Sequence, residues 1–480
     1  MRKTRLFALI IAVLMLVSML AACGGEKKPA ETTAATTAGT TAAPDTTAAD
    51  TTAADTTAGT TEPEIKTFDG YEFIIAGERG TSGNTFFVTS ATSALTNQLV
   101  RAYEGLEDDL DIVITFNDVG YDAVVANAVA NKATGDFIHF RHQYWIPLAV
   151  KGYIQPVNTD AIKAAGLDVS DGAVVDLYQT NVSKQLDGEN VWAFNVSGKY
   201  FSAPWGHALA FNQRLCAGAG YSAETIYDLV RNNQWTWAKF EEICRAISDP
   251  TANIDGYSML TNDTVEITSN IAINSLGADG KWTTNAEAQP FKDAVEWVIK
   301  IWNDRDVCVA VDYEMGNGAR RENFYKGNQG FMVLWCGDFG FENGKANTTM
   351  TDDYGYVPFP MGPNATTYSH IFADHYGFSL ETANKDVETS AYIMGQFCLT
   401  VNDPEEYETF ARGFMRDDAS VEMIVDYMLP YATFNTARLS SDTRQVVKEM
   451  VPEILRATSS GAVCESFGQQ MQAKINELFN

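Results

Sequence analysis

Short runs of apolar residues alternate with stretches of helical periodicity in the part of the chain that follows residue 68. Leu95, Leu99, Tyr103 and Leu106 recur three or four positions apart, which is the spacing of one helix face. Strands that alternate with helices of this length form a mostly parallel sheet with helices on its faces. The pattern therefore predicts, in order, a strand over 71–76, a helix over 92–109, a strand over 112–116, a helix over 121–134 and a strand over 137–140.

The middle of the chain contains two further apolar runs, over 200–203 and 207–212, that are separated by Pro204, Trp205 and Gly206. Proline supplies no backbone donor and glycine tolerates unusual backbone angles, so the chain is expected to change direction between two strands here. A tryptophan at such a break is more typical of a core than of a binding surface. The break nevertheless places a large aromatic ring where sheet pairing is interrupted.

A helix is predicted to begin after Thr236, which is a natural N-cap, and Trp235 and Phe240 are placed to form a hydrophobic staple around it. Trp237 lies on the apolar stripe of this helix and is expected in the core. The remaining chain is too long for one hydrophobic core and favours two lobes. Its expected elements are a helix over 291–303, a helix end and strand over 323–338, a proline-interrupted segment over 354–363, a short strand over 374–380 and mainly helices after that.

Residues 1–22 have the features of an export signal, with a basic start and an apolar run that is too short for a membrane span. The small residues before Cys23 resemble the bacterial lipobox, which implies cleavage before Cys23 and attachment of lipid, including palmitate, to that cysteine. Residues 23–64 are rich in threonine and alanine and show no apolar periodicity, so they are expected to form a disordered linker. The protein is therefore expected to be exported and held at the outer face of the cell membrane.

The formal net charge is −28, with 62 acidic and 34 basic residues. Such an excess of negative charge argues against nucleic acid or an anionic membrane surface as a partner. The acidity is compatible with any exported, soluble binding protein and does not by itself indicate a ligand.

Neither the cysteines nor the histidines are spaced like metal ligands. His139 and His142 lie near each other, but no third ligand follows at a suitable spacing, so we expect no metal site and no cofactor. Apart from Cys23, no two cysteines form a C-x-x-C pair. The sequence does not decide whether the other six are buried free thiols or whether some of them form a disulfide. These six cysteines are Cys216, Cys244, Cys308, Cys336, Cys398 and Cys464.

Several short motifs occur in the order found in family 1 extracellular solute-binding proteins, the receptor components of bacterial ABC importers, and the chain resembles that family over most of residues 68–400. The matching pieces are Gly135-Asp136-Phe137-Ile138 with Gly152 to Pro156, Pro204 with Ala210-Phe211-Asn212, Trp235 to Phe240, Phe324 to Gly327 with Gly330-Phe331-Met332, and Tyr354 to Pro360. The resemblance implies an α/β fold of the two-lobed, type II periplasmic-binding-protein kind. It also implies a monomer that binds a small solute and delivers it to the transmembrane subunits of an ABC permease.

The resemblance further implies that the chain crosses a hinge between the lobes three times, near 204–207, 356–360 and 399–403. Lobe I is then expected to consist of 65–206 and 358–400, and lobe II of 207–357 and 401–480. Known members of the family mostly carry sugars or oligosaccharides, so a carbohydrate is the expected solute. No catalysis is implied.

Polar and aromatic side chains at the expected ends of the first three strands mark a candidate cleft, because ligands gather beyond the carboxyl ends of parallel strands. A bound pyranose requires aromatic stacking for its C–H faces and polar groups for its hydroxyls. Maltose-type members have Trp, Asp and Arg after the third strand, where this chain has Phe140, Gln143 and Tyr144, so maltose itself is not the expected sugar. The candidate ligand-binding residues are Glu78, Arg79, Asp118, Phe140, Gln143, Tyr144, Trp205, Trp335, Asp338 and Asp374.

Two other functions remain open at this level. A surface carbohydrate-active hydrolase would use paired acids, which are abundant, although the sequence contains no G-x-S-x-G or H-E-x-x-H motif. A sensory or adhesive receptor could use the same fold, because a fold does not determine downstream partners.

Overall fold

The structure, a computed structural model, describes residues 65–78, 87–88, 94–197, 205–258, 270–308, 316–339, 346–372, 375–403 and 406–480. The chain divides into two compact units, Met1–Pro63 and Glu64–Asn480. All described residues belong to the second unit. The signal peptide, Cys23 and the linker lie outside the described residues, as do Arg79, Pro204 and Asp374.

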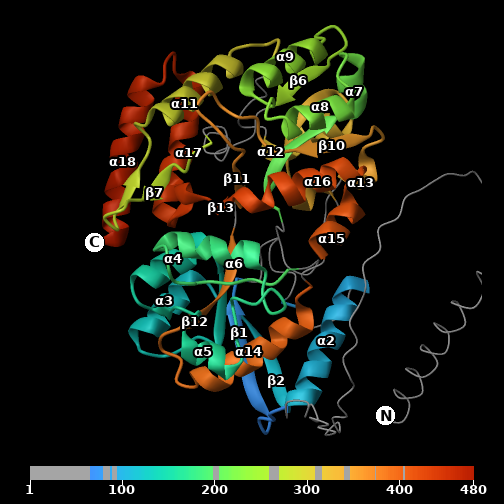
Figure 1. Cartoon of the computed structure of the whole chain (residues 1–480). Coiled ribbons are helices and arrows are strands. Elements are labelled where there is room, and N and C mark those ends of the chain that lie inside the picture. The colour runs from blue at the N-terminus through green and yellow to red at the C-terminus, as the bar shows by residue number, and fades with distance from the viewer. Residues whose placement is uncertain are drawn as a thin grey trace, which may run out of the picture. The chain divides into compact units, whose positions relative to one another are not determined.

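Lobe I is built on a five-stranded sheet in the order β2-β1-β3-β12-β4. β1 (Tyr71–Gly77) runs parallel to β2 (Ile112–Asp118) and β3 (Phe137–Arg141), as the sequence pattern predicted. β12 (Tyr376–Glu381) pairs antiparallel with β3 and with β4 (Ile154–Gln155). The helices of lobe I are α2 (Ala94–Leu110), α3 (Tyr121–Val129), α4 (His142–Val150), α5 (Asp160–Ala165), α6 (Leu177–Ser183), the 3₁₀ turn η1 (Lys184–Leu186) and α14 (Val387–Val401) (Figure 1).

Lobe II is built on a four-stranded sheet in the order β10-β5-β9-β6. β5 (His207–Asn212) pairs antiparallel with β10 (Tyr354–Val357) and β9 (Gln329–Trp335), and β9 is parallel to β6 (Asp255–Ser258). Two small sheets complete the lobe: β11 (His370–Phe372) lies parallel to β13 (Ala432–Phe434), and β7 (Asn274–Leu276) forms an antiparallel pair with β8 (Trp282–Thr284).

Helices surround these sheets of lobe II, and the last two described helices pack against each other (Figure 1). The helical elements are α7 (Gln213–Gly218), α8 (Ala223–Arg231), α9 (Trp237–Ile247), α11 (Gln289–Trp302), α12 (Gly316–Tyr325), η3 (Cys336–Phe339), α13 (Ala346–Thr349), α15 (Glu406–Phe414), α16 (Asp418–Tyr427), η4 (Leu429–Tyr431), η5 (Thr436–Arg438), α17 (Ser441–Arg456) and α18 (Gly461–Phe479).

In the described part of the chain, residues up to 197 and residues 375–403 belong to lobe I, and residues 205–372 and those from 406 onward belong to lobe II. The crossings expected near 204–207 and 399–403 stay predictions, because the segments that join the lobes there lie outside the described residues. Residues 358–372, which the sequence pattern places in lobe I, make their hydrogen bonds in lobe II. Met361 donates its backbone N–H to Trp235 and accepts one from Trp237, and β11 pairs with β13. The prolines of this segment interrupt sheet pairing, but they do not take the chain out of the lobe.

The predicted start of α9 is confirmed. The Thr236 side chain accepts a hydrogen bond from the backbone N–H of Lys239, and the rings of Trp235 and Phe240 meet edge to face with centroids 5.8 Å apart. Trp237 is 7% exposed and stacks on Trp297 at 4.9 Å, so it is a core residue as expected. The local sequence therefore specifies both the beginning of this helix and its buried face.

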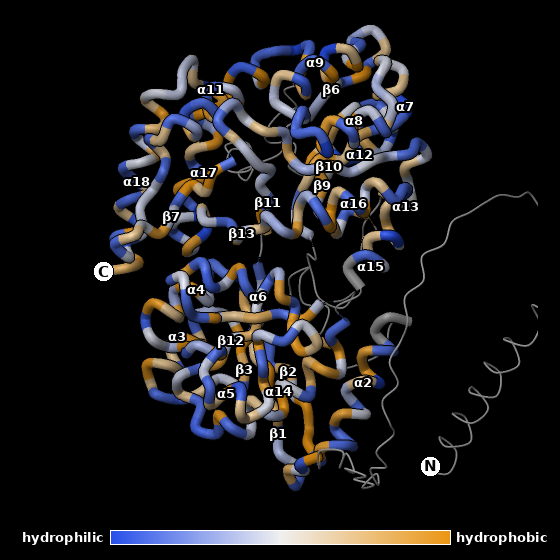
Figure 2. The backbone as a smooth tube through the Cα atoms, in the orientation of Figure 1, coloured by the Kyte–Doolittle hydropathy of each residue, from blue (hydrophilic) through white to orange (hydrophobic). Residues whose placement is uncertain are grey.

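The hydrophobic core extends from lobe I into lobe II. Figure 2 shows hydrophobic colours around β2, β3 and β12 within lobe I. The ring centroids of Trp145 in α4 and Phe434 in β13 are 6.4 Å apart. The centroid of Phe434 in turn lies 6.2 Å from that of Trp282 in β8. The six cysteines of the second unit are all buried, and they are thiols rather than members of disulfides, which answers the question that the sequence left open. Among the described helices, none has the length and apolar character needed to cross a membrane.

Candidate ligand-binding site

A cavity of about 660 Å³ lies between the lobes, within the size range of small-molecule sites. We call it the interlobe cavity. Its lobe I wall is formed by the residue after β1, the beginning of α3 and one side of α4 with its C-cap, and its lobe II wall by α17 with its N-cap and by α18. The lining residues are Glu78, Gly120, Tyr121, Asp122, Gln143, Tyr144, Pro147, Lys151, Ser440, Ser441, Asp442, Lys474, Glu477 and Leu478.

Three helices begin at this cavity. α3 follows Gly120 and α4 follows Arg141, and neither helix has a side-chain cap at its N-terminus. α17 follows Ser440, which forms a capping box with Thr443. Backbone N–H groups in the first turn of a helix have no partner within the helix, so helix beginnings favour oxygen atoms of ligands. At α4 the first of these donors, the backbone N–H of His142, is taken by the His375 carbonyl at 2.7 Å. The other backbone donors of these first turns lie near the carboxylate acceptors of the lining.

Gln143 lines the cavity and carries a buried polar side chain. Its side chain is 2% exposed, and its Oε1 atom is buried without a hydrogen-bond partner. Buried polar atoms are almost always paired, and an unpaired acceptor costs about 1–3 kcal/mol. A donor group of a ligand in the interlobe cavity would satisfy this atom.

Two tyrosines from different helices form the aromatic part of the cavity. The rings of Tyr121 and Tyr144 stack with centroids 5.3 Å apart and planes inclined by 28°. Phe140 supports this pair from the core, with its ring edge-on to Tyr144 at 6.1 Å. Burial raises the pKa of the Tyr121 phenol, and the carboxylates of Asp122 and Asp442 raise it further. Carboxylates of both lobes thus act on the same hydroxyl group.

Charged groups of both signs line the cavity. Burial raises the pKa of the Glu78 carboxyl, the charge of Arg141 opposes this shift, and the charge of Asp118 adds to it. On the lobe II side, Lys474 forms an ion pair with Glu477 at 2.7 Å. The lining therefore offers several carboxylate acceptors for hydroxyl groups, and its positive charge is divided between Lys151 and Lys474.

The structure brings together three of the predicted ligand-binding residues, Glu78, Gln143 and Tyr144. Asp118 is exposed at the end of β2, and its charge influences Glu78. Phe140 lies beneath the cavity, 1% exposed. These residues lie at or just after the carboxyl ends of β1, β2 and β3, as the rule for parallel strands leads one to expect, and their role in binding stays a prediction.

The lobe II residues of the prediction lie elsewhere. Trp205 is 0% exposed and has its carbonyl hydrogen-bonded to His370, so its ring offers no surface to a ligand in this structure. Asp338 is held by Arg321 at 3.0 Å and by the backbone N–H of Trp335 at 2.8 Å. None of Trp205, Trp335 and Asp338 lines the interlobe cavity. The lobe II lining of this cavity comes from α17 and α18 instead, while the end of β9 turns into η3, where Asp338 pairs with Arg321.

Not among the predicted residues are Gly120, Tyr121, Asp122, Pro147 and Lys151 in lobe I and the whole lobe II lining. Tyr121 and Asp122 follow the predicted strand end at Asp118 by only a few residues, so the strand-end rule, extended into the next helix, would have found them. Ser441, Asp442 and Glu477 carry no comparable signal, because nothing in their local sequence indicates that α17 and α18 pack against α4.

The two histidines that were considered as metal ligands have other roles. His142 bonds through Nε2 to the Asn435 carbonyl at 3.1 Å, and its Nδ1 accepts the backbone N–H of His375 at 3.2 Å. The His139 ring is buried and stacks on Tyr376. Within the described part of the chain, no three Cys, His, Asp or Glu residues are arranged to hold a metal ion.

No protein-family model and no curated protein matches the sequence. Solved structures do match. The sugar-binding protein MalE of Xanthomonas citri is 13% identical, with a TM-score of 0.59 over 85% of this chain and 98% of that one. UgpB of Mycobacterium tuberculosis, in complex with glycerophosphocholine, is 13% identical, with a TM-score of 0.57 over 86% and 99%.

An ABC substrate-binding protein of Listeria monocytogenes in complex with cycloalternan is 11% identical, with a TM-score of 0.54 over 85% of this chain and 100% of that one. At these identities the likeness concerns the fold, and it extends over nearly the whole length of each of these proteins. The chain therefore has the two-lobed α/β fold of the substrate-binding proteins of ABC transporters, as its motifs suggested.

Proposed function

We propose that this protein is a membrane-tethered extracellular receptor that binds a sugar or oligosaccharide and delivers it to the transmembrane subunits of an ABC-type permease. The lipid on Cys23 holds the protein at the outer face of the membrane. Residues 23–64 form a flexible linker that lets the folded part move away from the membrane surface. It acts as a monomer without a cofactor and catalyses no reaction. The fold supports this proposal, because the solved proteins that share it are binding proteins, several of them for sugars.

The single observation that carries the proposal is the buried Oε1 atom of Gln143, which has no partner and lines the interlobe cavity. An orphaned acceptor in a core would be a defect, whereas in a binding site it is a preformed contact for a ligand hydroxyl. A sugar also presents oxygen acceptors, which suit the uncapped N-termini of α3 and α4. Tyr121 and Tyr144 add an aromatic surface for its C–H groups.

Binding between the lobes also provides the signal that a transport receptor needs. A ligand that contacts α3 and α4 on one side and α17 and α18 on the other binds the closed arrangement more tightly than an open one. It therefore shifts the population of the two lobes toward closure by its differential affinity. A permease can then distinguish the loaded receptor from the empty one.

The proposal is tested by thermal unfolding of the full chain in the presence of a panel of sugars, polyols and glycerophosphodiesters. A ligand that binds only the native state raises the melting temperature, by an amount that grows with its concentration. We expect one or more carbohydrates to do so and to be recovered unchanged after prolonged incubation. Release of a shortened sugar would instead favour the hydrolase, and no shift with any carbohydrate would contradict the proposal.

A further inference from the structure

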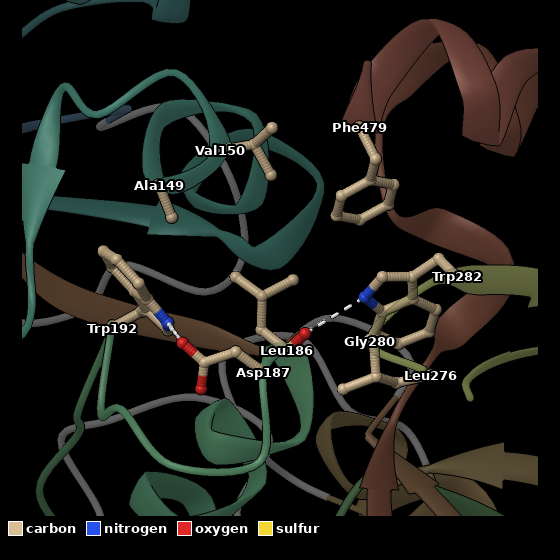
Figure 3. A pocket seen from close by; sticks show the side chains of 9 residues that line it. All are labelled: Ala149, Val150, Leu186, Asp187, Trp192, Leu276, Gly280, Trp282 and Phe479. Atoms are coloured by element: carbon tan, nitrogen blue, oxygen red, sulfur yellow. Dashed lines mark hydrogen bonds between the residues drawn. The ribbon is translucent and has the colours of Figure 1, made fainter. Parts of the chain in front are cut away.

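A second cavity, of about 330 Å³, lies between the lobes on another side of α4. We call it the aromatic pocket. Figure 3 shows Trp192 on one side and Phe479 with Trp282 on the other, with Leu186 between them. Ala149 and Val150 of α4, Asp187, Leu276 and Gly280 complete the lining. Lobe I therefore contributes Trp192, and lobe II contributes Phe479 and Trp282.

The indole nitrogens of this pocket are already engaged within the protein. Trp192 donates its N–H to Asp187 at 2.8 Å, and Asp187 also accepts backbone N–H groups of the following turn. Trp282 donates its N–H to the Leu186 carbonyl at 3.0 Å, and its ring stacks on Phe479 with an interplanar angle of 10°. The two indoles are thus held in place by these bonds. Trp282 is only 6% exposed and lies behind Phe479, so the half-buried rings of Trp192 and Phe479 provide the apolar surface of the pocket.

Two pairs of consecutive residues are divided between the aromatic pocket and the interlobe cavity. Val150 lines the former and Lys151 the latter, and in the same way Phe479 lines the former and Leu478 the latter. Consecutive Cα atoms are about 3.8 Å apart and α4 contacts α18, so both cavities lie near the contact between these two helices.

We propose that the aromatic pocket is a second subsite, which takes one further ring of the same ligand that the interlobe cavity holds. This inference rests on the proposed function. The occupant is a sugar ring, because its apolar C–H face matches fixed aromatic surfaces and its polar edge remains directed toward solvent and toward Asp187. The ligand is then a chain of linked rings, and residues of both lobes select its length.

The subsite is tested with the full chain and linear gluco-, manno-, xylo- and galacto-oligosaccharides of one to five rings, titrated by calorimetry. The measured quantity is the ratio of the affinity for the longest probe to that for the shortest probe of the series that binds. For the wild type we expect a ratio above ten. Trp192→Ala and Phe479→Ala should each lower this ratio about ten-fold, and the double variant should lower it no further, because both rings hold the same unit.

Matched variants separate this role from a general loss of stability. Trp302→Ala removes a half-buried tryptophan that lines neither cavity, so it should leave the affinity ratio unchanged. Trp192→Phe keeps a flat ring, so its affinity ratio should stay close to that of the wild type. A variant that merely destabilises the fold lowers the affinity for all lengths alike and leaves the ratio intact. An unchanged ratio in both alanine variants overturns the second subsite while the proposed function stands. If no sugar of any length binds the wild type, the proposed function itself fails.

Discussion

The indole N–H of Trp282, on strand β8 of lobe II, donates a hydrogen bond of 3.0 Å to the carbonyl oxygen of Leu186, at the end of η1 in lobe I. Trp282 is also buried between Phe434 and Phe479. This residue therefore links the lobes through both a directional bond and apolar packing, close to the cavities that lie between them.

Replacing Trp282 with Phe should keep most of the packing and remove the interlobe hydrogen bond. We expect the free energy of unfolding to fall by about 1–2 kcal/mol, because a buried carbonyl loses its donor. Small-angle scattering should show a larger radius of gyration for the unliganded variant than for the wild type. The matched control is Trp302→Phe, and equal scattering curves for wild type and Trp282→Phe would contradict the linking role.

Replacing Gln143 with Leu should have opposite effects on stability and on binding. The buried Oε1 atom has no partner, so an apolar side chain of similar volume should raise the unliganded stability by about 1 kcal/mol. The same change should weaken sugar binding about five-fold or more, because one hydrogen bond to the ligand is lost. Chemical denaturation and calorimetric titration measure the two quantities. Lower stability with unchanged affinity would show that Gln143 is structural.

Replacing Trp205 with Ala should destabilise the protein rather than remove a binding surface. The side chain is 0% exposed, so its loss should lower the free energy of unfolding by about 3–5 kcal/mol. Trp237→Ala, which removes the partner of Trp297, should behave in the same way. Urea denaturation measures both. Normal stability of Trp205→Ala combined with weak sugar binding would restore the ligand-facing role that the sequence suggested.

Two buried histidines should make the protein less stable in mild acid. Burial lowers the pKa of His370 and of His375 from 6.5 to about 4. Between these values the unfolded chain binds protons that the folded chain does not, so stability is fully present above pH 6.5 and is lost as the pH falls toward 4. Each group can account for a change on the order of 3 kcal/mol over this whole pH range.

The measurement is the free energy of unfolding at several pH values in the wild type and in His375→Gln. Gln can still donate to the Gln179 carbonyl that His375 bonds at 2.7 Å, but it does not titrate. The variant should therefore show a shallower loss of stability between pH 6.5 and 4. An identical slope in both proteins would rule out a contribution from His375.

Replacing Cys23 with Ala should release the protein from the membrane. Lipid attachment requires the cysteine thiol, and without the acyl chains nothing in the described part of the chain is suited to span a membrane. Fractionation of cells that express each form measures the distribution. Continued retention of the variant in the membrane fraction would disprove the lipid anchor.

The sequence by itself was sufficient for elements and features that depend on neighbouring residues. The alternation of apolar runs predicted β1, β2 and β3, and Thr236 with its flanking aromatic residues predicted the start of α9. The strand-end rule found Glu78, Gln143 and Tyr144, because parallel strands that follow one another bring their carboxyl ends to the same edge. These predictions use hydrogen-bonding and packing rules that act over a few residues or between successive elements.

Only the tertiary structure decided which distant segments complete the site. Ser441, Asp442 and Glu477 reach the cavity because α17 and α18 pack against α4, a contact between residues about 300 positions apart that no local pattern encodes. The same holds for Trp205, whose burial depends on partners such as His370, and for residues 358–372, whose lobe is set by hydrogen bonds to Trp235 and by β13. Local propensity determines which elements form, whereas burial and the pairing of polar groups between distant elements determine which surfaces remain open to a ligand.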